Sequence, residues 1–92
     1  MADFTVRVEL HEAGSDDYEN LHEAMASQGY SKMIQDQAGN WFYLPTAEYT
    51  ASKNLSAAQV RDQVVGIAKA IKVNPRVLVT QVADRSWALV KR

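Results

Sequence analysis

The chain has 92 residues, of which 47% are hydrophobic and 23% are charged, with two prolines and four glycines. This length fits one α+β domain, so we expect residues 1–92 to share a single hydrophobic core. The absence of cysteine excludes a disulfide framework, a thiolate zinc site and a thiol nucleophile. No apolar run approaches the ~20 residues of a membrane span, and the first residues do not resemble a signal peptide, so a cytoplasmic protein is expected.

The net charge of −1 hides two halves of opposite sign. Residues 1–50 contain nine acidic and two basic residues, whereas residues 51–92 contain eight basic and two acidic residues. If each half forms its own face, the basic face suits a phosphate backbone and the acidic face suits a cationic partner. If elements from both halves interleave, the charges largely cancel.

The first predicted elements are a strand and a helix. Hydrophobic and polar residues alternate from Phe4 to Leu10, the period of two that is typical of a strand with one buried side. A turn-forming segment follows, and the spacing then predicts a helix over about 16–28 that ends at Gly29. Its apolar face carries Tyr18, Leu21, Ala24 and Met25.

A hairpin is predicted after this helix. Tyr30–Gln35 reads as a short strand, and Asp36–Asn40 has the composition of a reversing turn. The alternation resumes over 46–52, which predicts the third strand. The apolar segment Trp41–Leu44 allows three interpretations: an extension of that strand, a hairpin arm folded over the core, or an interface patch.

The second helix has the clearest local signal. Ser56 and Gln59 have the spacing of a capping box, and Leu55 and Val60 are placed to form a hydrophobic staple, so the helix is expected to begin at residue 57. The buried stripe of this helix is expected to contain Val60, Val64, Ile67, Ala68 and Ile71.

The chain after this helix is expected to return to the sheet. Asn74-Pro75 is expected to stop the helix, and the β-branched segment 76–82 predicts a fourth strand. The tail, 83–92, is compatible with a short helix or a fifth strand. The order βαββαβ predicts a ferredoxin-like sandwich, with an antiparallel sheet and both helices on one face.

Several sites that occur on this fold are not indicated. His22 has no histidine four residues later, so the zinc-binding helix pattern is missing, and we expect no metal and no cofactor. The expected outward positions of the first and third strands carry no aromatic residue on which bases would stack. There is no glycine-rich phosphate loop.

The expected open face of the sheet instead carries a polar cluster. Arg7 and Glu9 of the first strand would lie near Glu48 and Thr50 of the third. One interpretation is cross-strand ion pairing on a solvated or dimer-forming face. The other is an acid/base pair with an arginine that stabilises a phosphate, the minimum for metal-free RNA cleavage through the 2′-hydroxyl.

At this point the chain resembles a known family. The string from Asn54 to Asp62 at the second helix, preceded by the Asp-x-x-Gly turn Asp36–Gly39 and the aromatic residues that follow it, looks like the GhoS antitoxin family, and the resemblance runs from Phe4 to about Val82. It implies a ferredoxin-like fold related to small CRISPR-associated nucleases. It also implies an endoribonuclease antitoxin that silences a membrane-acting toxin by cutting the toxin's messenger RNA. An arginine on the first helix of the endoribonuclease member falls at His22 here. The substitution fits either a histidine that acts as a general base near neutral pH or a relative that has lost cleavage.

Two functions therefore remain open. The first is a metal-independent endoribonuclease antitoxin that binds single-stranded RNA. Its candidate catalytic residues are Arg7, Glu9 and His22, and its candidate RNA-binding residues are Arg61, Lys69, Lys72 and Arg76. The second is a non-enzymatic module, a homodimer that uses its aromatic hairpin or sheet edge as the contact surface.

Overall fold

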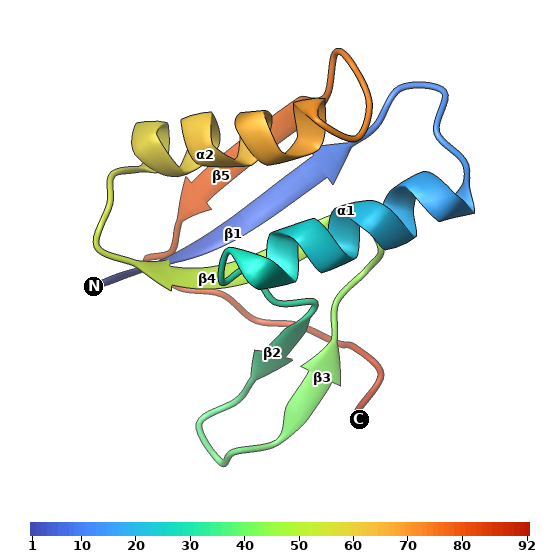
Figure 1. Ribbon diagram of the computed structural model, residues 1–92. Coiled ribbons are helices and arrows are strands. Elements are labelled where there is room, and N and C mark those ends of the chain that lie inside the picture. Colours follow the sequence, from blue (N-terminus) through green and yellow to red (C-terminus); the bar gives the residue numbers. More distant parts are fainter.

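The computed structural model describes all 92 residues, which form two helices and five strands. The elements in chain order are β1 (Ala2–Glu9), α1 (Ser15–Ser27), β2 (Met33–Gln35), β3 (Trp41–Tyr43), β4 (Glu48–Lys53), α2 (Ala57–Lys69) and β5 (Arg76–Gln81). Strands β4, β1 and β5 form one antiparallel sheet in that order, and β2 and β3 form a separate hairpin. Both helices cover one face of the larger sheet (Figure 1).

The central strand β1 organises the main sheet. It is antiparallel to both neighbours, with Val6 opposite Tyr49 on β4 and opposite Val79 on β5. The predicted alternation is confirmed, because Phe4, Val6 and Val8 are fully buried while the residues between them face the other side. One side of the sheet is therefore apolar and the opposite side, the open face, is mainly polar.

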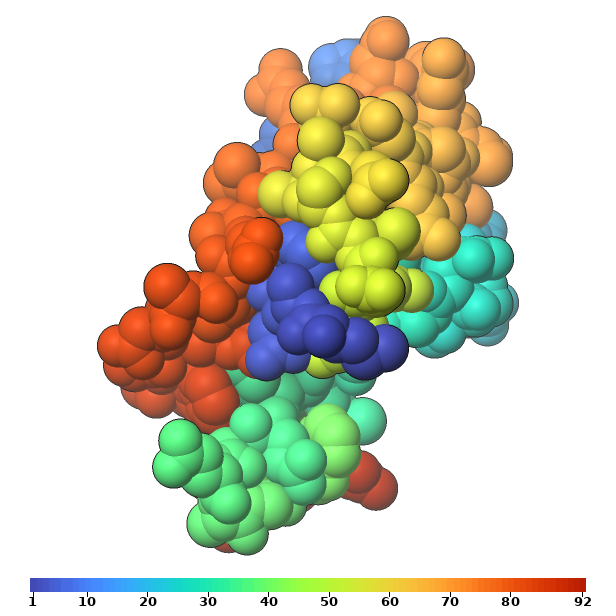
Figure 2. Space-filling model, turned by 90° about the vertical axis from the view of Figure 1, so that its left-hand side faces the viewer, coloured from blue at the N-terminus to red at the C-terminus, as the bar shows by residue number.

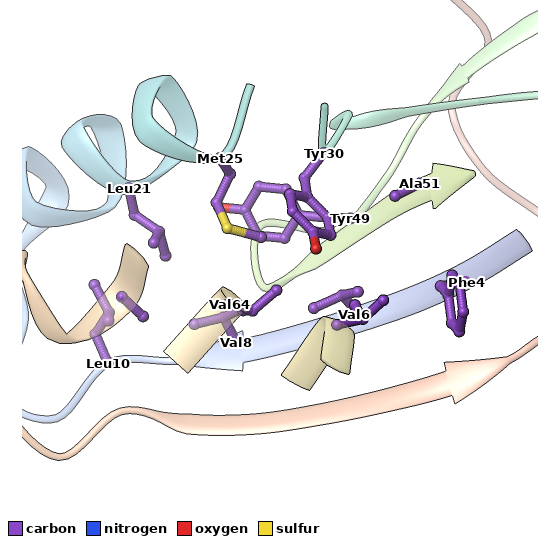
Figure 3. Packing of buried hydrophobic residues seen from close by; sticks show 12 residues of the cluster. Phe4, Val6, Val8, Leu10, Leu21, Met25, Tyr30, Tyr49, Ala51 and Val64 are labelled. Carbon is purple, nitrogen blue, oxygen red and sulfur yellow. The ribbon is translucent and has the colours of Figure 1, made fainter. Parts of the chain in front are cut away.

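The helices bury this apolar side. Leu21 and Met25 of α1 and Val60, Val64 and Ala68 of α2 join the side chains of β1 and β4 in one cluster, part of which appears in Figure 3. The side chains of Ile67 and Ile71 are partly buried against the same cluster. The predicted hydrophobic stripe of the second helix is thus confirmed for Val60, Val64, Ile67 and Ala68, whereas Ile71 packs on the cluster from the turn after the helix.

Both helices are delimited by local hydrogen bonds. Helix α1 ends in a Schellman motif, in which Gly29 N–H donates to Ala26 and Tyr30 N–H donates to Met25. Gly29 has a φ of +87°, in the left-handed region that glycine adopts most readily, so glycine suits this position.

Helix α2 begins as predicted and ends earlier than predicted. Ser56 and Gln59 form the reciprocal capping box, with hydrogen bonds of 3.1 and 2.9 Å. The helix ends at Lys69 instead of reaching Asn74-Pro75. Its last turn tightens where the amides of Ile71 and Lys72 both donate to the Ala68 carbonyl.

The prediction of an α+β fold with antiparallel strands is confirmed, but the predicted order βαββαβ is not the observed one. The observed order is βαβββαβ, which is compatible with a ferredoxin-like fold, but its strands divide between two sheets. The division occurs at Pro45, which cannot donate a backbone hydrogen bond and whose carbonyl accepts from Glu48 N–H in a turn. Trp41–Tyr43 is thus a hairpin arm, joined to the main sheet through a bridge between Ser31 and Thr50.

The tail is neither a helix nor a regular fifth strand. Residues 82–92 run from β1, where Val82 N–H donates to Asp3, to β3, where Tyr43 N–H donates to Val90 and Arg92 N–H donates to Trp41. The rings of Phe42 and Trp87 meet edge to face at 5.9 Å. Figure 2 shows most of this segment in red, to the left of the N-terminus in dark blue and above the hairpin in green.

The capping box gives a stability prediction. Replacing Ser56 by alanine removes the acceptor of Gln59 N–H, so unfolding should become easier by about 1 kcal/mol and the melting temperature should fall by roughly 4 to 8 °C. The matched control is Ser15→Ala, an exposed position in the first turn of α1, which should change stability by less than about 0.5 kcal/mol. Equal melting temperatures for the two variants would contradict the capping assignment.

Candidate active site

The three predicted catalytic residues lie on opposite sides of the main sheet. Arg7 and Glu9 point to the open face, because the residues that alternate with them are buried under the helices. His22 lies on α1 and contacts Tyr49, which is itself buried on the helix side. The structure therefore does not bring His22 together with the other two.

The side chains of the open-face cluster, Arg7 and Glu9, are exposed to solvent. Arg7 is opposite Glu48 on β4 and opposite Leu78 on β5, and has no carboxylate within 4.0 Å. Glu9 instead pairs with Arg76 at 3.5 Å. The side chains line a shallow hollow of about 290 Å³. An exposed pair of this kind contributes little to stability.

The four predicted RNA-binding residues do not share one groove. Arg61 binds its neighbour Asp62 at 2.9 Å, and Lys72 lies 3.9 Å from Asp17 on α1. Arg76 lies on the open face in its contact with Glu9, and Lys69 has no carboxylate partner. The basic second half is thus dispersed over both sides of the sheet and partly neutralised by the acidic first half.

A different cluster forms where α1 meets the edge of β4. The Nδ1 atom of His22 lies 2.5 Å from the hydroxyl of Tyr49, and the two ring centroids are 5.6 Å apart. The ammonium group of Lys32 lies 4.9 Å from the centroid of the same tyrosine ring. It donates to the backbone carbonyl of Glu48 at 2.7 Å and to that of Pro45. Tyr49 therefore contacts both a histidine and a lysine.

This environment shifts the pKa values of His22 and Lys32. Burial lowers the pKa of Lys32 to about 8, with an opposing effect from Glu48. Burial also lowers the pKa of His22, the charge of Lys32 lowers it further, and Glu19 opposes the shift. At pH 7 the histidine is therefore mainly neutral and the lysine mainly charged, which is the division expected of a base and a cationic partner.

His22 and Lys32 open onto one hollow of about 580 Å³, which we call the helix-side hollow. Burial raises the pKa of Tyr49 above its ordinary value, so its hydroxyl keeps its proton and can donate to Nδ1 or accept from it. The ammonium group of Lys32 has three N–H bonds, of which two are directed at carbonyls. A third remains for an anionic ligand.

A second hollow of about 400 Å³ lies beside the first. Both are lined by Gly29, Ser31 and Met33, so they flank residues 28–33, which we call the edge segment. The second is lined on its other side by Asp3, Ser52, Trp41 and Arg85, and we call it the hairpin-side hollow. Lys53, whose ammonium group lies over the Tyr30 ring at 4.7 Å, stands at the same segment.

Three cations without carboxylate partners thus gather around residues 28–33: Lys32, Lys53 and Arg85. None of them was predicted as a site residue. They come from three distant parts of the chain, which meet because Ser31 pairs with Thr50 on β4 and Arg85 of the tail reaches Thr5 on β1. Hydrophobic periodicity in the sequence could not have predicted this grouping, because it does not tell which distant side chains come together.

No group of three or more histidine, cysteine, aspartate or glutamate side chains is arranged to hold a metal ion. Neither helix has the length and hydropathy needed to span a bilayer.

The electrostatics of His22 can be tested by NMR titration of its ring. We expect a pKa below the ordinary value of 6.5, because burial and Lys32 both disfavour the imidazolium. Lys32→Gln should raise this pKa, whereas Glu19→Gln should lower it, so the two variants control for each other. A pKa at or above 6.5, or shifts in the same direction in both variants, would contradict the assignment.

Comparison with known families agrees with the resemblance seen in the sequence. The chain matches the family model described as Endoribonuclease GhoS over residues 1–87, which includes both hollows and every residue that lines them. A search of curated proteins found no match. Since the family match spans nearly the whole chain, the protein belongs to the GhoS endoribonuclease family.

Proposed function

We propose that this protein is an endoribonuclease that cleaves single-stranded RNA in the helix-side hollow. The observation that carries the proposal is the contact between His22 and Tyr49 beside Lys32. At pH 7 it places a neutral base, His22, near a charged ammonium group, that of Lys32. Membership of the GhoS family supports RNA as the substrate. In this proposal the open-face residues Arg7 and Glu9 take no part in cleavage.

The reaction begins with proton transfer to His22. In the tautomer whose Nδ1–H donates to the Tyr49 oxygen, Nε2 carries a free lone pair. Nε2 accepts the proton of a ribose 2′-hydroxyl, and the 2′-oxygen attacks the adjacent phosphorus. The bond from phosphorus to the 5′-oxygen breaks, and this oxygen takes a proton from water. The products are a 2′,3′-cyclic phosphate and a 5′-hydroxyl, and the imidazolium returns its proton to solvent.

Lys32 stabilises the phosphate during this step. Negative charge accumulates on the non-bridging oxygens as the phosphorus becomes pentacoordinate, and a fixed ammonium group beside them lowers the barrier. Two backbone carbonyls and the Tyr49 ring hold Lys32 in place before the substrate arrives. Because a base and a cation on this chain supply the chemistry, we propose that cleavage needs no metal ion and persists in chelator.

The biological role we propose is that of a cytoplasmic antitoxin. The resemblance to the GhoS family supports a toxin messenger RNA as the target. In cells, the transcript of a small hydrophobic membrane protein encoded beside this gene would then be cut when the protein is expressed. Primer extension on that transcript, compared with a strain that expresses His22→Gln, tests this role.

A homodimeric interaction module is the second candidate function. Two large apolar residues, Tyr43 of the hairpin and Val90 of the tail, favour it, because they are 50% and 73% exposed. They are neighbours, since Tyr43 N–H donates to the Val90 carbonyl. Sedimentation of the parent and of Tyr43→Ser at several concentrations tests it. A purely monomeric parent would exclude the dimer.

The cleavage assay uses a labelled single-stranded RNA in buffer with chelator. His22→Gln should slow cleavage by at least about 100-fold, since general acid–base groups contribute 10²- to 10⁴-fold. The matched control is His11→Gln, the other histidine, which is exposed in the turn after β1 and should keep the parent rate. Product ends should be 2′,3′-cyclic phosphates.

Arg7→Gln distinguishes the two faces in the same assay. Loss of cleavage in Arg7→Gln, with full cleavage in His22→Gln, would move the reaction to the open face and overturn the mechanism. If neither variant matters and all tested RNAs stay intact in the parent, the nuclease proposal fails.

A further inference from the structure

The hairpin-side hollow combines features that a nucleotide requires. Its volume of about 400 Å³ falls within the roughly 300 to 1,000 Å³ typical of ligand pockets. It contains a cation, Arg85, and a large aromatic side chain, Trp41. The polar side chains of Asp3, Gln35 and Ser52 line the remaining wall.

Arg85 is positioned but not neutralised. It is half-buried, and its Nη1 donates to the hydroxyl of Thr5 at 3.2 Å, which fixes the guanidinium over the open face of β1. No carboxylate lies within 4.0 Å of it. Asp3 lines the same hollow but accepts a hydrogen bond from Ser52. A guanidinium has five N–H donors, so most of those of Arg85 remain available to a phosphate group.

Trp41 supplies an exposed aromatic surface in the same hollow. Its side chain is 38% exposed, although it belongs to a hairpin whose Phe42 packs against Trp87. The backbone of Trp41 is held by Arg92 N–H and by pairing with Gln35. A tryptophan on a fixed backbone, next to a free arginine, is the arrangement by which proteins stack single-stranded bases.

The position of this hollow connects it to the proposed reaction. It shares Gly29, Ser31 and Met33 with the helix-side hollow that contains His22 and Lys32. A single strand whose cleaved phosphate lies beside Lys32 would therefore reach the hairpin-side hollow by crossing this edge segment. Lys53 stands at the crossing, where its ammonium group donates to the Gln28 carbonyl.

We propose that the hairpin-side hollow is a nucleotide subsite for single-stranded RNA, in which Arg85 binds a phosphate and the Trp41 indole stacks on the base of a nucleotide next to the cleaved bond. The inference rests on the proposed function, because it takes RNA as the ligand. It assigns a task to the hairpin and to the tail, neither of which contributes to the His22 cluster.

The test is a binding experiment that does not require cleavage. The probe is an eight-nucleotide single-stranded RNA with every 2′-hydroxyl methylated, which cannot undergo 2′-attack. In a Trp87→Phe background, Trp41 is the remaining tryptophan, and its fluorescence should be quenched as the probe binds. Probe anisotropy should show about tenfold weaker binding for Trp41→Ala and for Arg85→Gln.

Two controls separate binding from a structural role of Arg85. Arg92→Gln removes the same charge from the same tail outside the hollow and should change affinity by less than about twofold. Thr5→Val removes the hydrogen bond that positions Arg85 but keeps its charge, so it should weaken binding less than Arg85→Gln does and should leave the salt dependence unchanged. Arg85→Gln should also reduce the slope of log affinity against log salt by about one, and Arg85→Lys should restore it.

The outcomes distinguish the subsite from the proposed function. Binding without quenching of Trp41, or equal weakening by Thr5→Val and Arg85→Gln, overturns the subsite while His22-dependent cleavage can stand. Absence of probe binding also overturns the subsite, and the cleavage assay then decides the proposed function separately. Quenching together with the Arg85 effect supports the subsite.

Discussion

The burial of one side of β1 is the constraint on which the rest of this structure depends. Phe4, Val6 and Val8 are completely buried, and the helices pack on them and on the matching residues of β4. Because side chains of a strand alternate between faces, Arg7 and Glu9 must then lie on the opposite side. The molecule therefore has two chemically different surfaces, and a site on α1 cannot include the polar residues of β1.

Tyr49 links this core to the proposed active site. Its ring is buried against the helices, while its hydroxyl reaches the Nδ1 atom of His22 and its face lies under Lys32. The packing that stabilises the sheet thus also fixes the orientation of the histidine. The same burial lowers the pKa values of His22 and Lys32, so stability and chemistry have one physical origin here.

Local patterns in the sequence were sufficient to predict most of the fold. The alternation in β1, the capping box at Ser56 and the turn before Trp41 depend on residues close together in the chain, and the structure confirms them. The contact between His22 and Tyr49 joins residues 27 positions apart, and that between Thr5 and Arg85 joins residues 80 apart. Periodicity tells which face a side chain occupies, but not which distant side chain it meets.

The central claim is that a neutral His22 and a charged Lys32 act together on a phosphate, and the pH dependence of kcat/KM tests it most directly. The rate should fall on the acid side as His22 is protonated, below pH 6.5, and on the alkaline side as Lys32 loses its proton, near pH 8. Lys32→Arg should keep activity and remove the alkaline limb, because arginine stays charged. An alkaline limb that is unchanged in Lys32→Arg would contradict the account.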